Sequence, residues 1–190
     1  EVYGAQKKYP EAEAALQRAR DYYAQHDLPI QRARCEMRLG ELCLAQARWA
    51  EAHALLQEAR RACVTHDLVL FSAECDRLLA ELAARRGERA EAQRHLEQAR
   101  ATFQAQQLPF QLALCDLLEG ELHLAAGTLE AAESCFMRAQ PILAPAFPAV
   151  AWRAREGLGR CALQRDQRAL ALTHFQEAMR LIQSVRAPLP

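Results

Sequence analysis

Residues 40–59 read GELCLAQARWAEAHALLQEA, and 40 residues later the stretch 80–99 reads AELAARRGERAEAQRHLEQA. The same pattern returns at 120–139 and, after 39 more residues, at 159–178. Each copy has four matching positions at successive spacings of 12, 4 and 3: small, small, large apolar and alanine. These residues are Gly40, Ala52, Leu56, Ala59; Ala80, Ala92, Leu96, Ala99; Gly120, Ala132, Phe136, Ala139; and Gly159, Ala171, Phe175, Ala178. Equivalent positions in successive copies are called a column. Recurrence at a fixed period indicates a repeat protein.

Each repeat predicts two helices joined by a short turn. From Pro29 to Arg48, apolar or small residues recur at spacings of two to four, behind a proline that suits a first helical turn. A second run, Ala50 to His66, places them at spacings of three and four, and Gly87 and Gly127 stand in the break of later repeats. Two such helices cannot bury an apolar face alone, so neighbouring repeats must supply the core. The sequence therefore predicts a solenoid.

Helix packing explains why three of the four columns hold only glycine or alanine. Glycine or alanine at a helix crossing lets the two axes approach to about 8 Å. A larger side chain would force them apart or cost about 1–3 kcal/mol in overpacking. We expect the leucine or phenylalanine of each repeat to fill the gap beside the small residues.

These columns resemble the second helix of the tetratricopeptide repeat, which carries small, large apolar and small residues at spacings of four and three. The resemblance covers essentially the whole chain. It implies an all-α fold, a right-handed α-α superhelix of antiparallel helical hairpins that forms a single solenoid domain over residues 1–190. The implied repeats are approximately 1–28 (partial), 29–68, 69–108, 109–147 and 148–190.

The repeats depart from the tetratricopeptide pattern in two ways. Their unit is 40 residues long instead of about 34. The aromatic residue expected early in each first helix is replaced by a charged one: Glu36, Asp76, Asp116 and Arg155. Long, alanine- and arginine-rich repeats of this kind resemble those of large bacterial regulators, including signal-transduction NTPases and CHAT-domain proteases, in which they lie beside an effector domain.

Both ends of the repeat pattern carry irregularities. Glu1 to Leu16 aligns without gaps to Glu41 to Leu56, which predicts that the chain is a fragment that begins within a first helix. Pro141 and Pro145 predict that the second helix of the fourth repeat kinks or ends near Gln140. The apolar segment that follows, up to residue 152, either absorbs the one-residue deficit of this repeat or forms an exposed docking patch through Phe147 and Trp152.

Composition argues against several classes of partner. Basic and acidic residues number 24 each, so a phosphate backbone meets no net positive charge and we expect no nucleic acid partner. The longest uncharged stretch, 139–152, has 14 residues and three prolines, which is too short and broken to span a membrane. The seven cysteines are odd in number, fall within the helical pattern and follow no signal peptide, which predicts a reduced, cytoplasmic chain.

The sequence carries no catalytic, metal-binding or cofactor-binding motif. HExxH, CxxC, P-loop, GxGxxG and GxSxG patterns are absent, and the six histidines are scattered. Cys35, Cys75 and Cys115 recur every 40 residues. Equivalent points on adjacent repeats lie about 10 Å apart, beyond the ~7 Å limit for a disulfide and too far to share one metal. We therefore expect no enzyme, no metal and no cofactor.

The tetratricopeptide resemblance implies that first helices line a concave groove for a peptide or partner domain. The residues expected to face this groove are Arg34, Met37, Glu41, Glu74, Arg77, Glu81, Leu114, Leu117, Glu121, Arg153, Glu156 and Arg160. One glutamate per repeat forms a ladder that Arg160 ends: Glu1, Glu41, Glu81 and Glu121. Arg77 and Arg85, four residues either side of Glu81, are placed to neutralise it. Simple solvated charge and a groove for a basic or mixed peptide both remain open.

We expect a non-catalytic protein-interaction scaffold. The alternative is a regulatory or sensor segment of a multidomain signalling ATPase or CHAT-type protease, which an adjoining NTPase or protease domain would favour. Open apolar ends of the repeat array also allow end-to-end self-association, which a concentration-dependent mass would reveal.

The column assignment predicts which substitutions a repeat tolerates. Ala92→Leu or Ala132→Leu is expected to lower the melting temperature markedly, because the larger side chain overfills a helix crossing. Glu88→Ala, outside the columns, is expected to change it little. Thermal unfolding followed by circular dichroism measures all three, and equal small effects would contradict the assignment.

Overall fold

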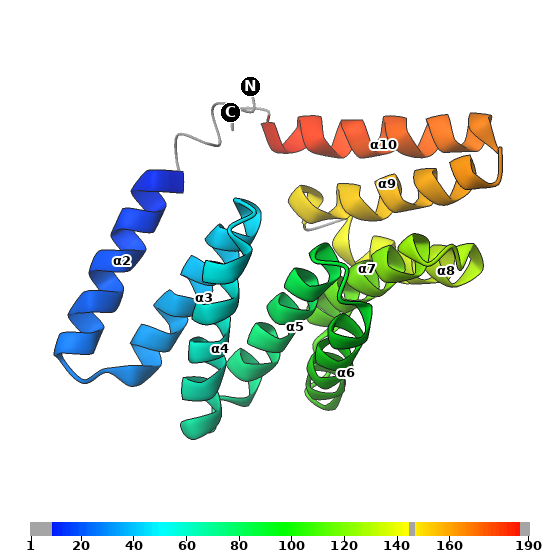
Figure 1. Ribbon diagram of the computed structural model, residues 1–190. Coiled ribbons are helices and arrows are strands. Elements are labelled where there is room, and N and C mark those ends of the chain that lie inside the picture. Colours follow the sequence, from blue (N-terminus) through cyan, green and yellow to red (C-terminus); the bar gives the residue numbers. More distant parts are fainter. Residues whose placement is uncertain (1–8, 145–146, 187–190) are drawn as a thin grey trace. The chain divides into compact units, whose positions relative to one another are not determined.

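The computed structural model describes residues 9–144 and 147–186, which form nine helices and no strand (Figure 1). The helices are α2 (Tyr9–Gln25), α3 (Pro29–Ala45), α4 (Trp49–Thr65), α5 (Val69–Arg85), α6 (Arg89–Ala105), α7 (Pro109–Ala125), α8 (Leu129–Leu143), α9 (Pro148–Gln164) and α10 (Arg168–Arg186). They follow one another as antiparallel hairpins, which confirms the predicted all-α class of helical pairs. The first helices of the repeats are α3, α5, α7 and α9, and each is followed by its second helix.

The chain divides into two compact units, and the boundary falls between Thr102 and Phe103, inside α6. In the first unit, the core is built around Met37, Leu56 and Leu82. In the second, it is built around Phe136 and Leu158. A single solenoid domain over residues 1–190, with a right-handed superhelix, stays a prediction.

Apart from the α8 to α9 junction, the turns between the described helices share one backbone conformation. A residue with positive φ follows the helix end, and the next N–H donates to a carbonyl five residues back, as from Arg48 to Cys43 at 2.9 Å. This Schellman-type closure satisfies carbonyls that the helix end leaves free. Gly87 and Gly127 fill the left-handed position in two turns, as their place in the sequence predicts. Elsewhere the position is taken by other residues: Asp27, Ala47, Asp67, Gln107 and Asp166.

The small columns lie against the large apolar column, as predicted. A Cβ atom added to Gly40 would lie 2.7 Å from Cγ of Leu56, and one added to Gly120 would lie 2.6 Å from Cε1 of Phe136. Both distances are shorter than any real carbon contact. The two alanine columns of the second helices are buried as well, for example Ala52 and Ala132 at 0% exposure. The small residues thus let the backbone of the first helix contact the leucine or phenylalanine side chain of the second helix directly.

Phe136 is held from two sides. Gly120 on α7 lies against one part of the ring, and Gly157 on α9 against another, where an added Cβ would lie 2.4 Å from Cζ. The ring is fully buried. The second-helix phenylalanine therefore fixes its own hairpin and also seats the first helix of the next one.

The α8 to α9 junction does not show the helix end that was one of the two outcomes expected near Gln140. The helix continues to Leu143. Pro141 lies in the last turn, and the N–H of Ala144 still donates to Gln140 O at 2.9 Å. Phe147 stacks on Phe110 with ring centroids 4.1 Å apart, so the suggested apolar patch is partly covered on this side.

The seven cysteines are all buried and free of disulfides. Burial raises the pKa of Cys35, Cys43, Cys135 and Cys161, which keeps these thiols protonated. They pack as small apolar side chains, as expected. Among the described helices, none is both long and apolar enough to cross a membrane.

The clamp on Phe136 generates a stability prediction. Gly157→Ala is expected to destabilise the protein by about 1–3 kcal/mol, because the new methyl group meets a ring that cannot move away. This would exceed the gain of about 1 kcal/mol that alanine brings to a helix interior. Urea unfolding measures the change.

The matched test of the clamp is a double-mutant cycle. Phe136→Leu removes the ring, so the effect of Gly157→Ala in that background should be close to zero or stabilising. Equal effects in both backgrounds would show that the ring and the glycine are not coupled.

Candidate binding face of the first helices

In the first unit, three of the six expected groove residues reach solvent. Arg34 is exposed, and Glu41 and Glu74 are half-buried. The other three, Met37, Arg77 and Glu81, are only 3%, 8% and 8% exposed. Met37 belongs to the core of this unit.

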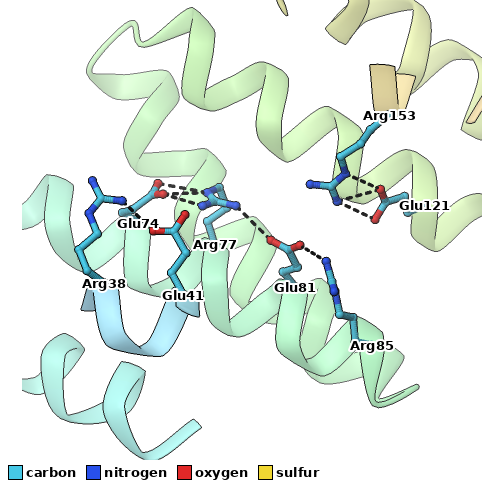
Figure 2. A network of polar contacts seen from close by, with 8 residues as sticks. All are labelled: Arg38, Glu41, Glu74, Arg77, Glu81, Arg85, Glu121 and Arg153. Carbon is cyan, nitrogen blue, oxygen red and sulfur yellow. Dashed lines mark hydrogen bonds and ion pairs between the residues drawn. The ribbon is translucent and has the colours of Figure 1, made fainter. Parts of the chain in front are cut away.

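The charges of α5 pair with one another along the helix (Figure 2). Arg77 Nη2 lies 2.6 Å from Glu74 Oε1, and Arg77 Nη1 lies 3.5 Å from Glu81 Oε2. Arg85 Nη2 lies 2.7 Å from the other oxygen of Glu81. The predicted neutralisation of Glu81 by Arg77 and Arg85 is thus confirmed.

The other described glutamates of the predicted ladder are paired too. Glu41 on α3 contacts Arg38 at 2.8 Å, and Glu121 on α7 contacts Arg153 on α9 at 2.9 Å (Figure 2). Glu1 lies outside the described residues. Because each described rung has its own arginine, the ladder presents little net negative charge. This favours self-paired charge over a groove for a basic peptide.

In the second unit, the expected residues divide between core and surface. Leu117 is 1% exposed and belongs to the core, and Leu114 is half-buried against it. The Glu121 to Arg153 ion pair joins two first helices, so these predicted residues do lie together. Arg160 lies 3.8 Å from Glu156, one turn away on the same helix.

A hollow of about 270 Å³ lies between α2, α3 and α5 on the first-helix face. Its lining residues are Leu16, Tyr23, Gln31, Arg34, Cys35, Met37, Arg38 and Phe71. Arg34 stacks over the Phe71 ring, 5.4 Å from its centroid, and makes no ion pair with a described residue. This arrangement leaves an accessible cation beside an apolar recess.

The repeat pattern explains why this hollow exists. Arg38 stands 40 residues before Leu78, in the column that becomes Gly157 in the fourth repeat. Leu78 is buried, whereas the Arg38 side chain is 58% exposed and turned to Glu41. The gap beside Leu16 is therefore not filled. The sequence-based prediction of groove residues did not include Arg38 and Phe71, because it assigned the same three positions of every first helix to the groove. The charged residue at Arg38, in a column that otherwise holds apolar or small residues, could have indicated this hollow.

A buried polar column replaces the aromatic residues that the tetratricopeptide pattern expects. Asp76 on α5 accepts a hydrogen bond from Arg60 Nε on α4 at 2.8 Å and lies 2.7 Å from His95 Nδ1 on α6. Asp116 on α7 is 2.9 Å from Arg138 on α8. Each acid thus joins a first helix to a second helix through a charge-assisted contact.

The fourth repeat carries the same contact with the charges exchanged. Arg155 on α9 lies 2.9 Å from Glu177 on α10. These residues stand 39 positions after Asp116 and Arg138. The change of sign at both ends of the pair is visible in the sequence alone and could have predicted this contact.

The described part of the chain holds no group of three or more histidine, cysteine, aspartate or glutamate residues that could bind a metal. The buried His95 and Asp76 pair belongs to the polar column described above. A larger hollow of about 520 Å³ between α4, α5 and α6 has Arg60, Asp76 and Cys63 among its lining residues.

The arrangement of helices is similar to that of a solved structure, BtubC (BKLC) from P. vanneervenii, a bacterial kinesin light chain that contains tetratricopeptide repeats. The fold is tetratricopeptide-repeat-like. The TM-score is 0.71 at 18% sequence identity, over 98% of this chain and 78% of that one. No protein-family model matches the chain, and no curated protein matches its sequence. The likeness therefore concerns the fold.

Glu36, the first member of the polar column, generates a pH prediction. Burial raises its pKa, Arg32 opposes the shift and Glu58 adds to it. Its Oε2 atom is buried without a hydrogen-bond partner. A carboxyl with a raised pKa in the folded state destabilises the fold when charged, and this penalty disappears as pH falls below the unfolded value. Glu36→Gln is therefore expected to raise the melting temperature by about 1–3 °C at pH 7.5.

The gain from Glu36→Gln should shrink steadily between pH 7.5 and about pH 4.5. Glu51→Gln is the matched control, because its hydrogen bond to Arg48 lowers the pKa of Glu51 and gives the opposite sign. That variant should lose stability or stay neutral at pH 7.5. A gain from Glu36→Gln that does not depend on pH would refute the charge argument.

Proposed function

We infer that the chain is a non-catalytic interaction scaffold that binds a peptide or partner domain on the exposed face of its first helices. A fold of helical hairpins similar to a tetratricopeptide-repeat protein supports protein binding in general. The observation that carries the finer inference is Arg34, a cation without an ion-pair partner among the described residues, at the mouth of the hollow on α2, α3 and α5.

The lining of this hollow indicates the chemistry of the ligand. Leu16, Met37 and Phe71 form the apolar part of the lining of this hollow of about 270 Å³, and that part suits one aliphatic or aromatic side chain. Arg34 stands beside it, and a guanidinium pairs best with a carboxylate. The ligand is therefore a peptide segment with an acidic residue next to a large apolar one.

The regulatory alternative uses the same surface. If the ligand segment belongs to an effector domain of the same polypeptide, the repeats would restrain that domain through the hollow. Only the resemblance to repeats of large bacterial regulators supports this version.

A pull-down read by mass spectrometry tests the proposal. The face variant carries Arg34→Glu and Arg38→Glu, both at exposed positions. The control variant carries Arg61→Glu and Arg89→Glu, which make the same charge change on exposed residues of α4 and α6. A partner retained by wild type and control and lost by the face variant would support binding at this face.

Two other outcomes decide between the remaining readings. A partner that all three proteins retain would place the binding site elsewhere. Empty samples for all three would favour the regulatory segment, which finds its ligand within its own polypeptide.

A further inference from the structure

The last helix, α10, exposes an apolar stripe. Leu172 and Met179 are 58% and 59% exposed, and Phe175 and Ile182 are half-buried between them. The spacings of three, four and three place these four residues on one face of the helix. The adjoining side of α10 packs on α9 and buries Ala171 and Ala178, one turn away from Phe175 and Ile182.

The equivalent stripe on α8 is covered by a helix. Phe136 and Leu143 on α8 stand where α10 has Phe175 and Ile182, and both are 0% exposed. The cover is α9, which places Gly157 against the ring of Phe136. Phe175 is seated against Gly159 of its own hairpin in the same way, but the side that Gly157 occupies in the earlier repeat is open.

The outer residues of the stripe have changed from polar to apolar. Position 172 corresponds to His53, Gln93 and Glu133, and position 179 corresponds to Arg60, Arg100 and Gln140. At both positions α10 is therefore more apolar than every earlier second helix. This change indicates a surface built to be covered by an apolar neighbour.

We propose that the stripe Leu172, Phe175, Met179 and Ile182 is a docking site for an amphipathic helix that a partner protein presents. The partner helix lies on α10 as α9 lies on α8. It carries glycine or another small residue opposite Phe175 and an uncharged residue opposite Met179.

The charge rule comes from the buried polar column. Arg60 on α4 binds Asp76 of the helix that covers α4. Met179 stands in the column of Arg60 and cannot pair with an acid. An acidic residue in the covering helix would be buried without a partner, so the site selects against it.

The size rule comes from Gly157. A Cβ at that position would lie 2.4 Å from the Phe136 ring, and a partner residue opposite Phe175 meets the same constraint. A second α10 face does not meet it, because it offers Phe175 itself at the centre of the stripe. The site therefore favours a helix with a small residue over a second copy of this chain.

The probe is a labelled 17-residue peptide with the sequence of α9, Pro148–Gln164, carrying Arg155→Leu to remove the charge opposite Met179. Fluorescence anisotropy with the full chain is expected to show saturable binding at or below about 100 μM peptide. Adding Gly157→Leu to this peptide, or replacing Arg155→Leu with Arg155→Asp, should weaken binding at least about tenfold.

Protein variants locate the site. Leu172→Glu with Met179→Arg gives α10 residues that Glu133 and Arg60 already supply at the equivalent positions, so the fold should survive. This variant should bind the probe at least about tenfold more weakly. Leu170→Glu is the control, because Leu170 is 45% exposed but lies two residues, or about 200°, around the helix from Leu172. Its affinity should stay within about twofold.

Several results would overturn the proposal. These are no binding to the wild type, equal binding of all three peptides, and equal binding by the double variant at unchanged melting temperature. A mass that doubles with concentration in the wild type but not in the double variant would assign the stripe to a second copy instead. The Arg34 and Arg38 variant should bind the probe normally, so failure here leaves the first-helix face untouched.

Discussion

The contact on which the rest depends is the close approach of a small residue to a leucine or phenylalanine inside each hairpin. An added Cβ at Gly40, Gly120 or Gly159 would lie within 2.7 Å of that side chain, so the two backbones are as near as their atoms allow. Such contacts fix the distance between helices and, through the shape of the ring, their rotation. Once that geometry is set, the next first helix must fit the outer side of the same ring, as Gly157 fits Phe136. The repeat length follows because any slip would place a larger residue against the ring.

The buried polar column adds a second condition on register. A charged pair inside a protein gains little net stability, since desolvation offsets much of the attraction. It does exclude wrong pairings, because Asp76 displaced from Arg60 and His95 would be buried alone. The exchanged pair of Arg155 and Glu177 keeps this condition within the hairpin of α9 and α10. At the positions where the tetratricopeptide pattern expects an aromatic residue, this chain therefore has charged contacts. These contacts add less stability than apolar packing but discriminate more strongly between helix registers.

The sequence predicted the hairpins well because packing at fixed spacing leaves a periodic trace. Ala92, Ala132 and Phe136 were assigned to buried columns from recurrence alone, and all are buried at 0%. The expected binding residues were less well placed, because a template position does not state whether a side chain turns inward. Arg77 and Leu117 lie inside, as does Met37 at the same template position. Glu81 also lies inside, although Arg160 at its template position is exposed. The left-handed backbone at Ala47 and Gln107 could not be predicted in the same way as at Gly87 and Gly127, because alanine and glutamine carry no preference for positive φ.

Binding surfaces in a repeat protein are found where a column breaks without a packing reason. Arg38 breaks the column of Leu78 and leaves an unfilled hollow beside an accessible guanidinium. Met179 breaks the column of Arg60 and leaves an apolar stripe on the last helix. Arg38 gains only an exposed ion pair with Glu41 while the hollow loses dispersion contacts, and the exposed methionine gains none. Both are consistent with side chains that make their contacts with another molecule. The two surfaces also differ in chemistry, because one offers a cation beside a recess and the other offers only apolar groups, so they select different ligands.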